Sequence, residues 1–160
     1  MKNSSGIAIA LLGALFFVAS GSVANYSSSW YRHLRKPEWV TFERYIPLIW
    51  MLIYVATTAS AILSWRSVRD LKARTTIFSL LGVNAVLNLL FTPIFTRRRD
   101  LVGAFVDASA IVATIAGVMA SQWRVARGAA LLNLPYLLWS TIAACITWSI
   151  YRQNAEQQSA

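Results

Sequence analysis

Residues 101–122 of the chain read LVGAFVDASAIVATIAGVMASQ, with Asp107 as the single charged side chain. A helix needs about 20 mostly apolar residues to cross the hydrocarbon core of a bilayer, so this stretch predicts a transmembrane helix. Four further stretches of similar length and character lie at about 6–25, 46–65, 76–95 and 129–151. We therefore predict an all-α, polytopic membrane protein in which five transmembrane helices form a bundle.

The composition of the chain favours the same class of protein. Hydrophobic residues make up 57% of the 160 residues and charged residues 13%, so most of the chain must face something other than water. The net charge of +9 would by itself suggest a nucleic-acid partner. The basic residues, however, form short clusters between the apolar stretches, as they do in loops that meet anionic lipid headgroups. The sequence therefore predicts membrane lipid, and no nucleic acid, as a partner.

The predicted domain organisation is a single transmembrane domain over residues 1–152 and a polar carboxyl-terminal tail over 153–160. The apolar run at 6–25 is longer than the core of a signal peptide, so we interpret it as a retained helix of a multi-pass integral membrane protein. Basic residues are almost evenly divided between the two sides of the bundle. The positive-inside rule therefore does not fix the orientation, and the identity of the membrane is left open.

The connection between the first two predicted helices, residues 26–45, is far longer than a hairpin needs. Loops of this length are usually either functional or disordered. This one carries Trp30, Tyr31 and Trp39, and a segment rich in aromatic residues is unlike a disordered one. Aromatic rings gain little by lying in water. We predict that the loop is a folded lid over one end of the bundle.

Polar and aromatic side chains within the predicted helices indicate a binding pocket. Polar groups are costly in hydrocarbon, so they should face the interior of the bundle. Asn84 and Asn88 are four residues apart and share one face of their helix, where they pack between helices or contact a ligand. Aromatic rings with a few amide groups suit a flat, largely apolar ligand. The candidate ligand-binding residues are Trp30, Trp39, Trp50, Tyr54, Asn84, Asn88, Phe91, Asp107, Tyr136 and Trp139.

Asp107 is the one carboxylate within the predicted transmembrane helices. A lone carboxylate in a membrane is a functional hypothesis by default. The arginines at 97–99 are its nearest basic candidates, and long side chains of this kind can extend along a helix to form an ion pair. A paired or protonated structural acid and a proton relay both remain open.

No catalytic motif is visible in the sequence. It lacks a nucleotide-binding glycine loop, a Gly-x-Ser-x-Gly elbow and a Ser/His/Asp set. The single histidine, His33, and the single cysteine, Cys145, are far apart in the sequence, so we predict no metal site and no disulfide. An enzyme is the less favoured class, and no catalytic residue is predicted.

Three segments, in the loop and in two of the predicted helices, together resemble the TspO/MBR family, also called the translocator protein or peripheral benzodiazepine receptor family. They are Trp30-Tyr31-x-x-Leu34-x-Lys36-Pro37-x-Trp39, Asn88-x-x-Phe91-Thr92-Pro93-Ile94-Phe95 and Pro135-Tyr136-Leu137-x-Trp139. The resemblance implies a five-helix membrane protein, often dimeric, that binds porphyrins, haem precursors and other flat ligands in a pocket closed by the first loop. The chain departs from the family pattern at Thr41-Phe42, where the family usually has two prolines, so we expect a differently hinged lid.

The resemblance and the aromatic residues together predict a membrane binding protein or receptor for porphyrins and related flat apolar ligands, with tetrapyrrole transport or regulation left open. The alternative is a transporter or a light-dependent porphyrin-degrading activity. No cofactor is expected apart from a porphyrin or haem-type ligand. Small residues such as Gly103, Ala104 and Gly117 allow close helix approach, so we also predict a homodimer.

Overall fold

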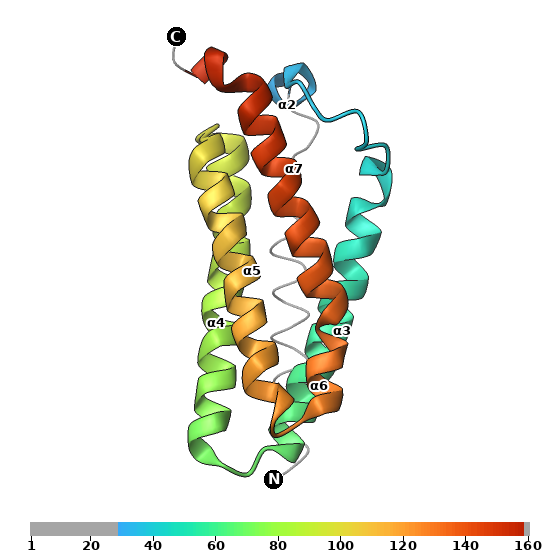
Figure 1. Ribbon diagram of the computed structural model, residues 1–160, viewed down its shortest axis with the longest axis vertical. Helices are drawn as coiled ribbons and strands as arrows, with labels where there is room; N and C mark the ends of the chain where they lie inside the picture. Colours follow the sequence, from blue (N-terminus) through green and yellow to red (C-terminus); the bar gives the residue numbers. More distant parts are fainter. Residues whose placement is uncertain (1–28, 159–160) are drawn as a thin grey trace.

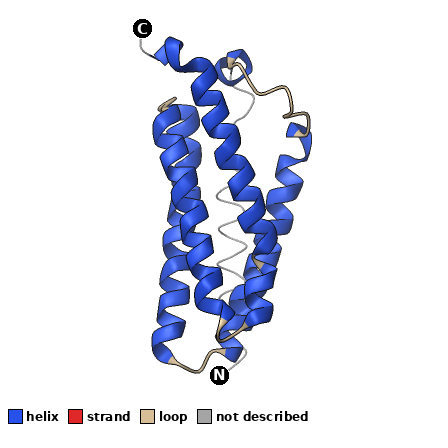
Figure 2. Ribbon diagram, viewed as in Figure 1, coloured by secondary structure: helices blue, strands red, loops and turns tan. Residues whose placement is uncertain are grey.

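The chain folds into long, roughly parallel or antiparallel helices, and the computed structural model describes residues 29–158 of it (Figures 1 and 2). No strand is present in this part of the chain. The predicted helix at 6–25 lies outside the described residues. The elements are α2 (Ser29–His33), η1 (Glu43–Tyr45), α3 (Ile46–Ser67), α4 (Leu71–Thr92), η2 (Pro93–Arg97), α5 (Leu101–Trp123), α6 (Arg127–Leu132) and α7 (Leu134–Gln158).

Four of the described segments are long and apolar enough to cross a membrane, namely Glu43–Ser67, Leu71–Arg97, Leu101–Trp123 and Arg127–Ala155. Large apolar side chains such as Val55, Val106 and Leu138 lie exposed on the outside of the bundle. Water does not favour so many exposed apolar groups, whereas the hydrocarbon of a bilayer does. The prediction of an all-α, polytopic membrane protein is confirmed.

Aspartates in the connections begin two of the transmembrane helices. Asp70 Oδ2 accepts a hydrogen bond from the backbone N–H of Ala73 at 2.7 Å, and Asp100 Oδ1 accepts one from Gly103 at 2.8 Å. Such caps satisfy backbone donors that have no partner within the first turn of a helix. A Cβ atom at Gly103 would overlap Asp100 Oδ2, so a larger residue at this position would displace the capping carboxylate.

Three helix limits differ from the sequence prediction. The helix expected at 76–95 begins earlier, at Leu71, because the Asp70 cap allows the polar turn after it to be helical. Its last part is a wider π-helical turn from Pro93 to Arg97, since proline has no N–H to continue the regular pattern. At the carboxyl end, α7 continues through residues 153–158, in the segment that the sequence predicts to be a polar tail.

The helix expected at 129–151 is broken at Asn133 into α6 and α7. Proline is tolerated in the first turn of a helix and not in its interior, so the break places Pro135 at the start of a new helix. The break also turns the Asn133 side chain into the bundle. Its Nδ2 donates to Ser60 Oγ at 2.8 Å and to Gln122 Oε1 at 3.0 Å.

Gln122, Ser60, Ser64 and Asn133 form a polar cluster at this end of the bundle, and all four are fully buried. Gln122 Nε2 donates to Ser60 Oγ at 2.9 Å and to Ser64 Oγ at 2.8 Å. Ser60 Oγ in turn donates to the carbonyl of Ala129 at 2.8 Å. These hydrogen bonds connect α3 with α5, α6 and the start of α7 in a region without water to replace them.

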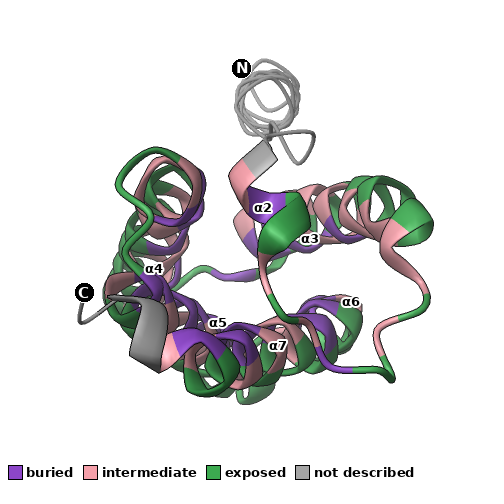
Figure 3. Cartoon of the chain, turned by 90° about the horizontal axis from the view of Figure 1, so that it is seen from above, coloured by how far each residue is buried: buried purple, intermediate pink, exposed green. Residues whose placement is uncertain are grey.

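The helices are arranged around α5, which packs along both α4 and α7, while α3 packs mainly on α6 (Figures 1 and 3). Two apolar clusters form the core. The larger surrounds Ile111, Ile115 and Val118 of α5 together with Tyr136 and Trp139 of α7. The smaller lies at the other end, where Tyr31, Phe95, Leu101, Ala104 and Ile150 meet beneath α2. Between α3 and the other helices, a cavity remains.

Candidate ligand-binding site

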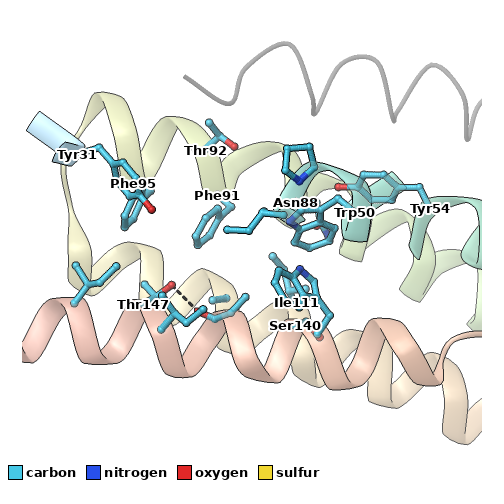
Figure 4. Close-up of a pocket in the computed structure, with 17 residues that line it drawn as sticks. Tyr31, Trp50, Tyr54, Asn88, Phe91, Thr92, Phe95, Ile111, Ser140 and Thr147 are labelled. Carbon is cyan, nitrogen blue, oxygen red and sulfur yellow. Dashed lines mark hydrogen bonds between the residues drawn. The ribbon is translucent and has the colours of Figure 1, made fainter. Parts of the chain in front are cut away.

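A cavity of about 280 Å³ lies inside the bundle, near the end covered by α2 (Figure 4). Its lining comes from the first loop and from all four long helices, and within the described part of the chain no charged side chain contributes to it. The lining residues are Tyr31, Ile46, Pro47, Trp50, Tyr54, Asn88, Phe91, Thr92, Phe95, Ala108, Ile111, Trp139, Ser140, Ala143, Ile146, Thr147 and Ile150. A neutral, mostly apolar wall with few polar groups is typical of sites for small apolar molecules.

Aromatic rings form two walls of the cavity. On α3, Trp50 is stacked on Tyr54, with ring centroids 5.4 Å apart and planes 27° apart. On α4 and η2, Phe91 is stacked on Phe95, with centroids 5.7 Å apart and planes 9° apart. Figure 4 shows both pairs beside the cavity, on separate elements. Such pairs give the cavity flat faces, against which a planar ligand can stack.

The hydroxyl group of Tyr136 joins the two asparagines of α4. It donates to Asn84 Oδ1 at 2.6 Å and accepts a hydrogen bond from Asn88 Nδ2 at 2.5 Å. Asn84 Nδ2 donates to the Ile111 carbonyl at 3.1 Å and to Thr114 Oγ1 at 2.8 Å. Asn84 is therefore a packing residue, which connects α4 with α5 and α7 by hydrogen bonds.

Asn88 has a different role, because its side chain also lines the cavity. Its Nδ2 group is used by Tyr136 and by the Asn84 carbonyl, which accepts at 2.8 Å. Its Oδ1 atom makes no hydrogen bond with the residues that the structure describes. This oxygen is a hydrogen-bond acceptor available to a ligand.

Trp139 contributes a hydrogen-bond donor. Its side chain is only 8% exposed and lines the cavity, and its ring makes a T-shaped contact with the Phe42 ring of the loop at a centroid distance of 5.9 Å. Its indole Nε1 is buried without a hydrogen-bond partner in the described part of the protein. Buried indole N–H groups usually have a partner, so a ligand acceptor would satisfy this one.

The first loop is folded over the cavity and held by contacts within itself. Tyr31 lines the cavity, and its hydroxyl group donates to Glu43 Oε1 at 3.1 Å. Lys36 Nζ lies 3.0 Å from the same oxygen and 4.0 Å from the centre of the Tyr31 ring. Tyr31 is thereby fixed between the two halves of the loop, as the roof of the cavity.

The other two aromatic residues predicted in the loop lie outside the cavity. Trp30 packs its edge on Phe95 at a centroid distance of 5.6 Å, behind the lining. Trp39 is 51% exposed and packs against Phe42 at 6.4 Å. Phe42, which occupies part of the position of the missing proline pair, is the residue that reaches Trp139.

Asp107 is 6% exposed in α5 and does not line the cavity, although its neighbour Ala108 does. Its Oδ2 atom has no hydrogen-bond partner in the described part of the protein, and Asp107 forms no ion pair with another described side chain. The pairing considered with the arginines at 97–99 is therefore not formed. Arg97 is the last residue of the π-helical turn, and Arg98 and Arg99 follow it. The Arg99 guanidinium lies over the Trp30 ring.

The structure thus brings together five of the predicted residues around the cavity, namely Trp50, Tyr54, Asn88, Phe91 and Trp139. Asn84 and Tyr136 lie behind them in the hydrogen-bond network. The lining of α7 was not predicted beyond Trp139. Its remaining members follow Trp139 at the spacing of one helix face, so the periodicity of the sequence contains that signal. They are Ser140, Ala143, Ile146, Thr147 and Ile150.

We expect Tyr136→Phe to lower the free energy of unfolding by about 1 kcal/mol, because it removes two interhelical hydrogen bonds within the membrane region. Thermal unfolding in detergent measures this loss. Tyr151→Phe is the matched control, since Tyr151 is half-buried and its ring packs on Trp148 outside the network. Equal losses for the two variants would contradict the role assigned to Tyr136.

The fold and the cavity define a multi-pass integral membrane protein with an internal aromatic pocket under its first loop. The model of the TspO/MBR family matches residues 7–152, and the chain belongs to this family.

Relatives align with nearly the whole chain. It is 28% identical over 155 residues to the uncharacterized membrane protein YtaB of Bacillus subtilis, covering 96% of this chain and 99% of the relative. It is 29% identical over 154 residues to the tryptophan-rich protein TspO of Bacillus cereus, with coverage of 96% and 99%. The human translocator protein is 26% identical over 139 residues, with coverage of 86% and 82%.

Proposed function

We propose that this membrane protein binds porphyrins or related flat, apolar molecules in the cavity beneath its first loop. The observation that carries the proposal is the combination of two aromatic walls with a buried, unpartnered indole N–H of Trp139 in the same cavity. The stacked rings suit a planar ligand. The Trp139 N–H and the Asn88 Oδ1 atom can hydrogen-bond to polar groups at the edge of such a ligand.

The small size of the cavity supports a role of the first loop in letting the ligand enter. At about 280 Å³ the cavity is slightly smaller than the usual range for small-molecule sites, which is about 300–1,000 Å³. A tetrapyrrole macrocycle needs more room than this. Entry of a porphyrin therefore requires Tyr31 and the rest of the loop to move outward from the position described here.

Titration of the detergent-solubilised protein with protoporphyrin tests the proposal. We expect the tryptophan fluorescence to be quenched and to saturate at one porphyrin per chain, because Trp50 and Trp139 would lie against the ligand. Quenching that rises linearly without saturation would contradict a defined site. The absorption band of the porphyrin, followed under illumination, separates the two classes of function. A constant band supports binding, and a decaying band indicates the alternative, a degrading activity.

The homodimer stays a prediction, and the structure changes the reason for it. Ala104 is fully buried, and Gly117 lies against Leu80 of α4, 3.4 Å from where its Cβ would be. Gly103 packs on the Asp100 cap. These small residues of α5 serve packing within one chain. A second copy would therefore have to bind elsewhere on the bundle.

A further inference from the structure

Asn154 lies near the carboxyl end of α7, beside the first loop, and is 2% exposed. Its Oδ1 atom accepts a hydrogen bond from the backbone N–H of Arg35 at 3.0 Å. Its Nδ2 group donates to the backbone carbonyl of Arg35 at 2.9 Å and to the carbonyl of Ile150 at 2.8 Å. One side-chain amide thus satisfies both backbone groups of a single loop residue.

The two hydrogen bonds fix the backbone of the loop at Arg35 and do not involve the Arg35 side chain. Backbone N–H and C=O groups away from water need partners, and a loop has no neighbouring strand or helical turn to supply them. The Arg35 side chain is exposed and takes no part in the pair. A substitution of that side chain should therefore leave the contact intact, whereas a substitution of Asn154 removes both bonds at once.

The pair of Asn154 with Arg35 lies next to Tyr31, the loop residue that covers the cavity. Tyr31 precedes Arg35 by four residues, and its carbonyl accepts a hydrogen bond from the N–H of Leu34 at 3.4 Å. Ile150 precedes Asn154 by one helical turn. Tyr31 and Ile150 pack in the same apolar cluster, and both line the cavity. The face of α7 that forms part of the wall therefore continues into the residue that holds the loop.

The loop has other anchors on both sides of Arg35. Before Arg35, Trp30 and Tyr31 pack on Phe95 of η2, at centroid distances of 5.6 Å and 6.0 Å. The ion pair of Lys36 with Glu43 connects two parts of the loop and is partly exposed, and such pairs contribute little. The Phe42 ring packs on Trp139 near the far end of the loop. Between α2 and Pro37, the pairing with Asn154 is the one hydrogen-bonded attachment to the helical bundle within the described residues.

We infer that Asn154 is a positioning residue, which holds the first loop closed over the cavity through the backbone of Arg35 and thereby slows the release of ligand. The part of this inference that concerns release rests on the proposed function. The part that concerns the loop does not.

Hydrogen–deuterium exchange of the ligand-free protein tests the attachment itself. Asn154→Ala should speed exchange of the Arg35 N–H by about tenfold, the effect of losing hydrogen bonds of ordinary strength. Gln153→Ala, an exposed neighbour on the same helix turn, and Arg35→Ala, which keeps the backbone, should both exchange as the wild type does. Asn154→Leu keeps the number and branching of the side-chain heavy atoms and serves as the second variant if the alanine variant folds poorly.

Stopped-flow fluorescence with protoporphyrin tests the effect on the ligand. We expect release from Asn154→Ala to be about tenfold faster, with the association rate no slower than in the wild type. Unchanged exchange at Arg35 would overturn the attachment. Faster exchange with unchanged release would overturn the positioning role. If the wild type binds no porphyrin, the proposed function fails, and the exchange experiment still decides whether Asn154 holds the loop.

Discussion

The double variant Trp50→Phe with Trp139→Phe should bind protoporphyrin about 30- to 100-fold more weakly than the wild type. Phenylalanine keeps an aromatic ring at both positions, but it removes the indole N–H groups and part of the stacking surface. The loss of one hydrogen bond and of part of the stacking surface at both positions is on the order of 2–3 kcal/mol. Binding is measured through the porphyrin absorption spectrum, because the variant also removes the fluorescence that reports on the site.

The matched control is the double variant Trp123→Phe with Trp148→Phe. Both of these tryptophans are exposed on the outside of the bundle, where Trp123 lies near Arg127 and Trp148 packs on Phe105. They contribute no atom to the cavity. We expect this control to bind porphyrin with the affinity of the wild type. If the variant within the cavity binds as tightly as the control, the porphyrin site lies elsewhere in the protein.

Gln122→Ala should lower the free energy of unfolding by about 3 kcal/mol. The substitution removes hydrogen bonds to Ser60, Ser64 and Asn133 and leaves these groups buried without their partner. Each lost interhelical bond contributes about 0.6 kcal/mol, and the unsatisfied groups and the cavity add to this cost. Unfolding by heat or by a denaturing detergent, followed by circular dichroism, measures the change.

Ser121→Ala is the control for this effect. Ser121 precedes Gln122, and its hydroxyl group donates only to the carbonyl of Gly117 in its own helix, at 2.8 Å. Its removal should change the free energy of unfolding by less than about 0.5 kcal/mol, the usual range away from special features. Comparable losses in the two variants would show that the polar cluster contributes nothing specific.

Hydropathy predicts the limits of a helix well where the sequence changes from apolar to polar at the end of that helix. The stretch at 101–122 corresponds to α5, which begins after the Asp100 cap and ends at Trp123. Hydropathy places the start of α4 too late because Lys72, Arg74 and Thr75 interrupt the apolar pattern. The Asp70 cap is the feature that makes this turn helical. The break at Asn133 depends on the partners of its side chain in α3 and α5, and a single sequence does not contain those contacts.

The same distinction applies to the site. Trp50, Asn88 and Trp139 were predicted because bulky or polar groups in a membrane helix need a reason to be there. Ala108 and Ala143 line the cavity because they are small, and smallness gives no chemical signal. Asn154 was missed for another reason. It lies beyond the apolar stretch, in a segment interpreted as a tail, and its role depends on a loop residue more than a hundred positions earlier.

Because the polar cluster around Gln122 holds α3 near Ser60, the rest of this helix can tilt about that point. Hydrogen bonds hold the helix at Ser60, and within the hydrocarbon no water is present to replace them. The first turns of the same helix line the cavity. From Ser60 to Ile46 the helix rises about 20 Å, so a tilt of about 5° around Ser60 would move Ile46 by about 2 Å. Such a motion would move the lining residues in the first turns of α3, Ile46 and Pro47, farther than those nearer Ser60, such as Tyr54.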